Sequence, residues 1–362
     1  MKTTPIAGIL AMLLILGLSV GVAAEDGTID QDLLKQFEKK FESRGDQSAL
    51  INAVTNNDLR QLSLNRERVI AHDKLLDHKV KSTGIIDQKS SGRCWLFAGV
   101  NCLAPKIMKE LDLDDFELSE SYLAFYDKLE KANLFLETMI AMRDRPVDDR
   151  SLNGYLGWMF GDGGWFHYFT DLLDKYGAVP ISAMPESKQS MKTGRVNELG
   201  KTLLRKYTAE LRRMHQQGQS EKDLRARKEE MLADIYRLLV FTYGKPPKEF
   251  TFRYETEEDS VKVIAEKHYT PKSFYDELLG DDLPEYVALV NNPAKKMDQL
   301  FEMEGSRNIF ERSDYTVLNL SADKLAEYTL AALLDSQIVW FACDVGQQNY
   351  RDSGIMALDI YD

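Results

Sequence analysis

Cysteine is scarce in this 362-residue sequence, which contains only Cys94, Cys102 and Cys343. Three cysteines cannot build a disulfide framework, and their odd number leaves at least one free thiol unless two chains pair. Their spacing is also unlike that of metal ligands. The sequence therefore predicts no metal site and no cofactor, and it leaves a free thiol as the first candidate for chemistry.

Basic residues are outnumbered, with 46 Lys and Arg against 58 Asp and Glu, which gives a formal net charge of −12. This balance argues against nucleic acid or an anionic membrane as the dominant partner. The stretch 192–228 is locally basic, and nucleic-acid binding through it stays open as a weaker hypothesis. The favoured interpretation of this stretch is a solvated helical hairpin.

Long apolar runs are absent after the first 24 residues. Within those residues, Lys2 precedes an apolar run at 6–22, and Val22-Ala23-Ala24 offers small residues before Glu25. This order is typical of a signal peptide covering 1–24, because 17 residues are few for a membrane span. The alternative is an uncleaved anchor. We expect cleavage, no membrane span in the mature chain, and export to a periplasm or beyond.

The composition, 44% hydrophobic and 29% charged, suits a large globular domain with an insertion or two modest domains. Apolar periodicity predicts long charged helices between 191 and 240, and shorter helices at 31–42, 94–111, 119–137, 165–176 and 271–279. β-Prone runs predict a short strand at 250–254 and a buried strand at 338–345.

Cys94 lies where a polar loop with Ser91 and Gly92 becomes an apolar helix. The first turn of a helix carries unpaired N–H groups that favour a thiolate, the form in which cysteine is nucleophilic. Acyl transfer also needs hydrogen-bond donors for its oxyanion. Gln88 lies six residues upstream, so its amide and the Cys94 backbone N–H are the candidate donors.

The segment Gln88-x5-Cys94-Trp95, with Ser91-Gly92-Arg93 before the cysteine, is similar to the papain-type nucleophile signature. Ser91 replaces the first cysteine of that signature, and Arg93 replaces its small residue. With these two changes the segment 87–99 resembles the bleomycin hydrolase and aminopeptidase C family of papain-like cysteine peptidases. This resemblance implies peptide hydrolysis through a Cys94 acyl-enzyme, with Gln88 as the oxyanion donor.

Further segments resemble the same family in the same order, so the similarity covers the chain from about residue 30 to its end. They are 118–122, 126–133, 175–177, 183–187 and 340–346. Asp162-Gly163-Gly164-Trp165 resembles the family loop that lines the non-primed side of the cleft. Gly163 and Gly164 are therefore the candidate substrate-binding residues, since glycine lets an extended peptide approach the main chain.

The resemblance implies an α+β, papain-like two-lobe fold with a large helical insertion and a truncated second, barrel lobe. It divides the chain into a signal peptide, an N-terminal helical arm, a helical lobe bearing the nucleophile, a helical insertion and the start of the barrel lobe. The corresponding boundaries are 1–24, 25–85, 86–190, 191–310 and 311–362. A homohexamer is also implied by this resemblance.

The family's catalytic histidine, which is followed by Ala, and its asparagine, which begins Asn-Ser-Trp, are not found. Of the five histidines, His167, His215 and His268 follow Cys94, and none has the family's surroundings. The matched part ends before both partners, so the alternative is an inactive homologue that acts as a binding or scaffold chain. Cys102 and Cys343 are predicted to be buried core residues.

Overall fold

The computed structural model describes residues 27–258, 261–280, 283 and 286–362. It forms two compact units, one made of residues 75–342 and the other of the described residues up to 74 together with 343–362. The predicted signal segment 1–24 lies outside the described residues. Within the described part of the chain, no helix combines the length and the apolar character that a membrane crossing requires.

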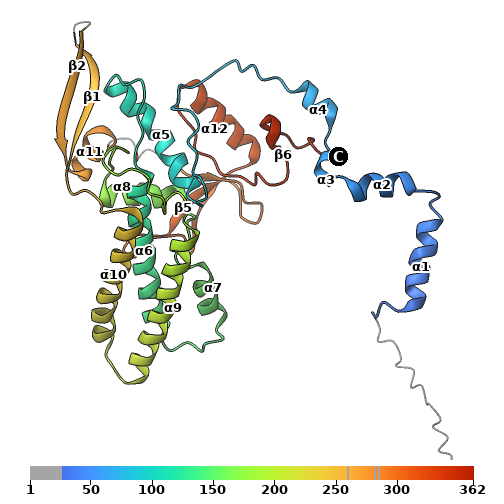
Figure 1. Ribbon diagram of the computed structural model, residues 1–362, viewed down its shortest axis with the longest axis horizontal. Coiled ribbons are helices and arrows are strands. Elements are labelled where there is room, and N and C mark those ends of the chain that lie inside the picture. The colour runs from blue at the N-terminus through green and yellow to red at the C-terminus, as the bar shows by residue number, and fades with distance from the viewer. Residues whose placement is uncertain (1–26, 259–260, 281–282, 284–285) are drawn as a thin grey trace, which may run out of the picture. The chain divides into compact units, whose positions relative to one another are not determined.

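The 75–342 unit is mainly helical, and α6 runs through it in contact with α5, α8, α9 and α10 (Figure 1). Its helices are α5 (Cys94–Glu110), α6 (Glu120–Ala141), α7 (Arg150–Trp158), α8 (Phe166–Tyr176), α9 (Gly194–Gln216), α10 (Glu221–Tyr243), α11 (Pro271–Leu278) and α12 (Ala322–Leu334). The predicted helices in this unit are confirmed to within a few residues, whereas α7 and α12 were not predicted.

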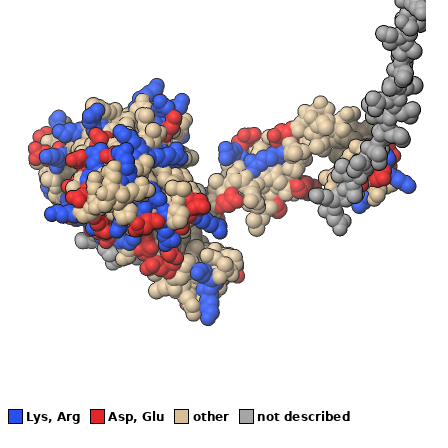
Figure 2. All heavy atoms as spheres, turned by 90° about the horizontal axis from the view of Figure 1, so that it is seen from below, with Lys and Arg blue, Asp and Glu red and all other residues tan. Residues whose placement is uncertain are grey.

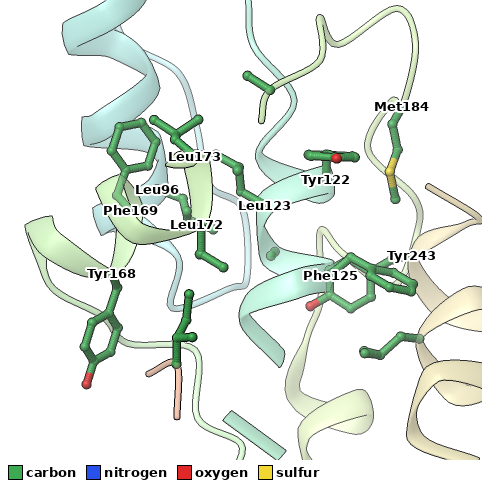
Figure 3. Packing of buried hydrophobic residues seen from close by; sticks show 14 of the residues in the cluster. Leu96, Tyr122, Leu123, Phe125, Tyr168, Phe169, Leu172, Leu173, Met184 and Tyr243 are labelled. Atoms are coloured by element: carbon green, nitrogen blue, oxygen red, sulfur yellow. The ribbon is translucent and has the colours of Figure 1, made fainter. Parts of the chain in front are cut away.

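The core forms where α5, α6, α8 and α10 meet (Figure 3). Leu96 of α5, Phe125 of α6, Leu172 of α8 and Leu239 of α10 are each fully buried. Apolar burial of this kind is the main stabilising contribution to a fold, at about 25 cal/mol per Å². It fixes α5, and therefore the residue at its first position, against the rest of the unit.

Local sequence signals explain where two of these helices begin or end. Ser119 caps α6 by accepting a hydrogen bond from the Tyr122 N–H at 3.1 Å. Gly177 ends α8 with φ 73°, a conformation that favours glycine. A Cβ at Gly177 would lie 2.2 Å from the carbonyl oxygen of Pro271, so this turn has no room for a side chain.

Strands are few. β1 (Phe250–Glu258) and β2 (Val261–Tyr269) form an antiparallel hairpin, which extends the predicted strand at 250–254. A second sheet has the order β3-β5-β4, with β5 (Tyr315–Asn319) parallel to β3 (Leu289–Val290) and antiparallel to β4 (Gln299–Met303). The chain is therefore α+β with helix predominating, as predicted.

The basic stretch 192–228 forms most of the helical hairpin α9–α10, as expected. Several of its cations pair with carboxylates: Arg225 and Lys228 with Glu137, and Arg227 with Glu210. On the face of the helical unit in Figure 2, basic and acidic atoms are interspersed.

The second unit combines four short helices with one small hairpin. The helices are α1 (Gln31–Glu42), α2 (Ser48–Asn56), α3 (Leu59–Leu62) and α4 (Arg66–Ala71), and the hairpin pairs β6 (Asn349–Tyr350) with β7 (Ile355–Met356) across η2 (Arg351–Ser353). The helix predicted at 31–42 is confirmed with those bounds. Arg60 of α3 donates a hydrogen bond to the Gln347 carbonyl at 3.3 Å, joining the two parts.

The prediction of a buried strand at 338–345 is wrong. These residues form no regular element and find no strand partner among the described residues. Trp340 is half-buried against Phe166 and Phe169, whereas Phe341 is 72% exposed. A β-prone run becomes a strand only when another strand satisfies its backbone hydrogen bonds, so the pattern alone did not suffice.

Candidate active site

Cys94 is the first residue of α5, and its side chain is exposed while the helix that follows is buried. The carbonyl of the N-cap residue Arg93 accepts hydrogen bonds from the N–H groups of Leu96 at 2.8 Å and Phe97 at 3.3 Å. The Cys94 N–H makes no hydrogen bond within the described residues. The thiol and a free backbone donor thus lie together at a helix N-terminus, as the sequence predicted.

Gln88 lies in the irregular loop before this helix. Its Oε1 is buried and accepts no hydrogen bond within the described residues, and none is found there for its amide nitrogen either. The loop itself is held at two points, because Ser91 Oγ donates to the Gln88 carbonyl at 2.8 Å and the Ser90 N–H donates to the Met191 carbonyl at 3.0 Å. The Gln88 amide is therefore a half-buried donor without a competing partner.

Arg93 is 1% exposed and forms a bidentate pair with Glu186, at 2.9 and 2.8 Å. Glu186 also accepts hydrogen bonds from Ser121 Oγ at 3.0 Å and Ser190 Oγ at 2.6 Å. Burial alone would raise the pKa of Glu186, but Arg93 and these hydroxyls lower it. The charged pair is thus well satisfied inside the protein, directly beside the nucleophile.

Asp162 joins the nucleophile segment to the glycine loop 161–164. Its carboxylate accepts hydrogen bonds from the Gly92 N–H at 3.1 Å and from Thr193 Oγ1 at 2.7 Å. Its carbonyl accepts from Trp95 Nε1 at 2.7 Å. Both sides of the candidate cleft are therefore tied to a single residue.

Two lysines of α6 donate hydrogen bonds to the same loop. Lys128, 1% exposed, donates to Asp162 Oδ1 at 2.6 Å and to the Phe160 carbonyl at 3.1 Å. Lys131 donates to the carbonyls of Gly161 at 3.2 Å and Gly163 at 2.6 Å. These bonds fix the backbone of the loop from one end to the other.

The pKa values of both members of the Lys128–Asp162 pair are shifted. Burial lowers the pKa of Lys128 to about 8, although Asp162 opposes this change. Burial alone would raise the pKa of Asp162, but Lys128 and the hydrogen bonds to the carboxylate hold it well below its usual value. The pair is charged at neutral pH, as a buried ion pair with good hydrogen bonds can be.

The two loop glycines have different surroundings. A Cβ at Gly164 would lie 2.5 Å from the indole of Trp95, whereas a Cβ at Gly163 would meet nothing within 4 Å. The N–H and the carbonyl of Gly164 make no hydrogen bond within the described residues. Gly164 can thus pair with an extended peptide, and its missing side chain is required for packing against Trp95.

Beside the glycine loop lies a cavity of about 800 Å³. Aromatic and apolar side chains such as Trp165, Tyr168 and Phe135 line it, together with Lys201 and Arg307. A cavity of this size is typical of a ligand site. Gly163 and Gly164, the candidate substrate-binding residues, are among the residues that line it.

The histidines of the 75–342 unit make their contacts away from Cys94. His215 lies 2.5 Å from Asp144, His268 lies 3.4 Å from Glu249, and His78 is exposed. No hydrogen bond, ion pair or ring contact joins any histidine of this unit to Cys94 within the described residues.

His167 is a buried core residue. It stacks on Tyr315 with 3.9 Å between ring centroids, and neither ring nitrogen has a hydrogen-bond partner within the described residues. Burial lowers its pKa to about 4, so the ring is neutral at pH 7. No hydrogen bond or ion pair joins this neutral ring to Cys94 within the described residues, so it does not hold the Cys94 thiolate as an ion pair.

The other two cysteines differ from each other. Cys102 of α5 is half-buried, and burial raises the pKa of its thiol to about 11. Cys343, predicted to be buried, is exposed, because the segment around it forms no strand. Cys102 is thus partly buried rather than the fully buried core residue that was predicted, and the prediction for Cys343 is wrong.

Sequence reasoning missed Arg93, Lys128, Lys131 and Glu186 as parts of the site. A signal was present, because Lys128 and Lys131 lie three residues apart in a helix that also carries the apolar residues Tyr122, Phe125 and Leu129 at helical spacing. Charged residues in a buried helix require partners, and here the partners lie on loops distant in sequence.

Replacing Gly164 by alanine is expected to lower the free energy of unfolding by about 1–3 kcal/mol, because the added methyl group meets the Trp95 ring. Gly163→Ala is the matched control and should change it by less than about 0.5 kcal/mol, since its Cβ enters open space. Urea denaturation of both variants measures the difference. Equal destabilisation by the two substitutions would contradict this assignment.

Comparisons with known proteins agree on one family. Residues 28–362 match the family model described as Peptidase C1-like family. Aminopeptidase C of Listeria monocytogenes is 36% identical over 330 residues, covering 91% of this chain and 74% of the relative. Aminopeptidase C of Lactobacillus helveticus is 33% identical over 335 residues, covering 92% and 74%.

A solved structure shares the fold. The crystal structure of PepW from Lactobacillus rhamnosis superposes with a TM-score of 0.87 at 33% identity, covering 93% of this chain and 76% of that chain. The candidate nucleophile lies inside the region that the family model matches. The chain belongs to the Peptidase C1-like family of cysteine peptidases, together with the bacterial aminopeptidases C.

Proposed function

We propose that this chain performs the acyl-transfer chemistry of a cysteine aminopeptidase, with Cys94 as nucleophile and Gln88 as oxyanion donor. The observation that carries this proposal is the exposed thiol at the first turn of a buried helix, beside a free backbone N–H. The names of the relatives support peptides with a free N-terminus as the substrate class.

In the acylation step the Cys94 thiolate attacks the carbonyl carbon of the scissile bond. A C–S bond forms, and the carbonyl π electrons move onto oxygen, where the Gln88 amide and the Cys94 N–H donate hydrogen bonds. Collapse of this intermediate breaks the C–N bond, and the leaving amine takes up a proton from solvent water. Water then attacks the thioester, which releases the acid and regenerates the thiol.

The substrate is placed by the glycine loop. An extended peptide pairs with the free N–H and carbonyl of Gly164, and its side chains face the cavity lined by Trp165 and Tyr168. The bonds from Lys131 to Gly161 and Gly163 hold the loop in place without using the groups that the peptide needs.

A second candidate function is peptide binding without turnover. It is favoured by one observation: none of the histidines in the 75–342 unit contacts Cys94 within the described residues. Proton delivery to a leaving amine normally needs a positioned acid. In this case the chain would bind peptides without forming an acyl-enzyme.

Two substrates distinguish these functions: an alanine p-nitrophenyl ester and an alanyl peptide amide. We expect the full chain to form one equivalent of thioester at Cys94 from the ester, seen by intact-mass spectrometry, with little or no turnover of the amide. Peptide binding without any ester adduct would favour the second function. Sustained amide hydrolysis that both Cys94→Ala and His268→Ala abolish would show that a histidine of this chain supplies the proton.

We further propose a papain-like arrangement of two lobes in which residues from 311 onward begin the barrel lobe. We also propose export after cleavage behind Ala24, and a homohexamer as the family resemblance implies. N-terminal sequencing of the exported chain should begin at Glu25, and sedimentation of that chain should report the assembly. An N-terminus at Met1 would refute the proposed cleavage, and a monomer would refute the proposed homohexamer.

A further inference from the structure

The nucleophile loop contains an unusual buried cation. Arg93 directly precedes Cys94, is 1% exposed, and uses three different nitrogens in three hydrogen bonds. Nη1 and Nη2 hold the two oxygens of Glu186, while Nε donates to Ser91 Oγ at 3.1 Å. Burying a guanidinium is costly, so its retention beside a nucleophile calls for a reason beyond packing.

The hydrogen bonds continue from Arg93 to the oxyanion donor. Ser91 Oγ accepts from Arg93 Nε and donates to the Gln88 carbonyl at 2.8 Å. A serine hydroxyl has one donor and two acceptor sites, so it can make both bonds at once. A continuous series of hydrogen bonds thus connects Glu186 through Arg93 and Ser91 to the backbone of Gln88.

Neighbouring polar groups do not compete for the hydrogen bonds of this series. Burial raises the pKa of Glu120 to about 8 although Arg93 opposes this change, and no hydrogen bond joins the Glu120 carboxyl to Arg93 within the described residues. The Tyr243 hydroxyl near Arg93 is buried and has no partner within the described residues. Glu186 is therefore the charged partner of the Arg93 guanidinium.

Geometry explains why the residue is arginine. The planar fork of a guanidinium fixes the direction of Nε once two nitrogens are bound to a carboxylate. A lysine at this position could keep the charge but could not bind Glu186 in bidentate fashion and Ser91 at the same time. The direction of the Nε–H bond sets the place of Ser91, and Ser91 sets the place of Gln88.

We propose that Arg93 and Ser91 are positioning residues that hold the Gln88 amide where it stabilises the oxyanion formed at Cys94. They touch neither substrate nor thiol and act through the loop backbone. The pairing also explains why the two departures from the papain-type signature, Ser91 and Arg93, occur together: each is the hydrogen-bond partner of the other.

The test rests on the proposed function and compares two reactions of the Cys94 thiol. Acylation by the alanine p-nitrophenyl ester passes through an oxyanion, whereas alkylation by iodoacetamide is a displacement that forms none. Both rates are measured by intact-mass spectrometry on the full chain, followed by peptide mapping to Cys94. The ratio of the two rates reports oxyanion stabilisation separately from thiol accessibility, and it requires no turnover.

Gln88→Ala is expected to lower the acylation rate by about 100-fold, the usual effect of losing one oxyanion donor. Ser91→Ala and Arg93→Lys should each lower it by about 10-fold, since the donor remains but is misplaced. The alkylation rate should stay within about twofold of wild type in all three variants. Ser91→Thr keeps the hydroxyl and should retain the wild-type ratio.

Matched controls are Ser151→Ala and Arg195→Lys, which alter exposed positions on α7 and α9. The proposal is overturned if Gln88→Ala lowers the ratio while Ser91→Ala and Arg93→Lys do not, or if Ser91→Thr behaves like Ser91→Ala. A ratio unaffected by Gln88→Ala would instead refute the proposed oxyanion donor itself. If Arg93→Lys does not fold, the Ser91 pair decides the question alone.

Discussion

Replacing Cys94 by alanine is expected to abolish acylation of the chain, with a loss of at least about 10⁴-fold that places the rate below detection. Neither of the other cysteines is placed as Cys94 is, because Cys102 is held protonated by a pKa of about 11 and Cys343 lies in an irregular segment rather than at a helix N-terminus. The measurement is the mass adduct formed with the alanine p-nitrophenyl ester.

Two matched variants test whether the ester adduct depends on Cys94 alone or on either of the other thiols. Cys343→Ala removes an exposed thiol, and Cys102→Ala removes a half-buried one, and both should leave the ester adduct in place. Iodoacetamide should still label Cys343 in the Cys94→Ala chain, which shows that the reagent reaches the protein. An ester adduct that survives in Cys94→Ala would contradict the assignment of the nucleophile.

Lys128→Met is expected to lower the free energy of unfolding by about 3–5 kcal/mol, the effect of removing one partner of a buried ion pair. The substitution keeps the size of the side chain but leaves the Asp162 carboxylate without its cation. It also removes the hydrogen bonds to the Phe160 carbonyl and to Asn197. Urea denaturation, with circular dichroism as the probe, measures the loss.

The double variant Lys128→Met with Asp162→Asn tests the reason for this loss. With both charges gone, no uncompensated charge stays buried, so the double variant should recover at least about half of the lost stability. Arg195→Lys, in an exposed ion pair with Glu198, is the control and should change stability by less than about 0.5 kcal/mol. Strictly additive losses at Lys128 and Asp162 would contradict the pairing.

Helices with strong local signals could be predicted from the sequence. Apolar spacing after Ser119 indicates α6, and Gly177, which the structure shows with a positive φ, indicates the end of α8. The sheet β3-β5-β4 could not be predicted, because its strands are short and their pairing is set by contacts distant in sequence. The run 338–345 shows the converse, since a strong β signal formed no strand.

The same distinction holds for the site. Cys94, Gln88 and the glycine loop could be named as candidates because each belongs to a motif that is contiguous in sequence. The residues that hold them in place, Arg93 with Glu186 and Lys128 with Asp162, come together only through the fold. A motif names the groups that react, whereas the partners of buried charges depend on tertiary geometry.

The burial of the Arg93–Glu186 and Lys128–Asp162 pairs has a consequence for the solvent conditions the site tolerates. Salt screens exposed charges over about 10 Å at 0.1 M, but mobile ions do not enter a packed interior. Both pairs are nearly closed to water, with side-chain exposures of 2% and 19% for the first and 1% and 11% for the second. The frame around Cys94 should therefore keep its shape across a wide range of ionic strength, while surface pairs such as Arg195–Glu198 weaken.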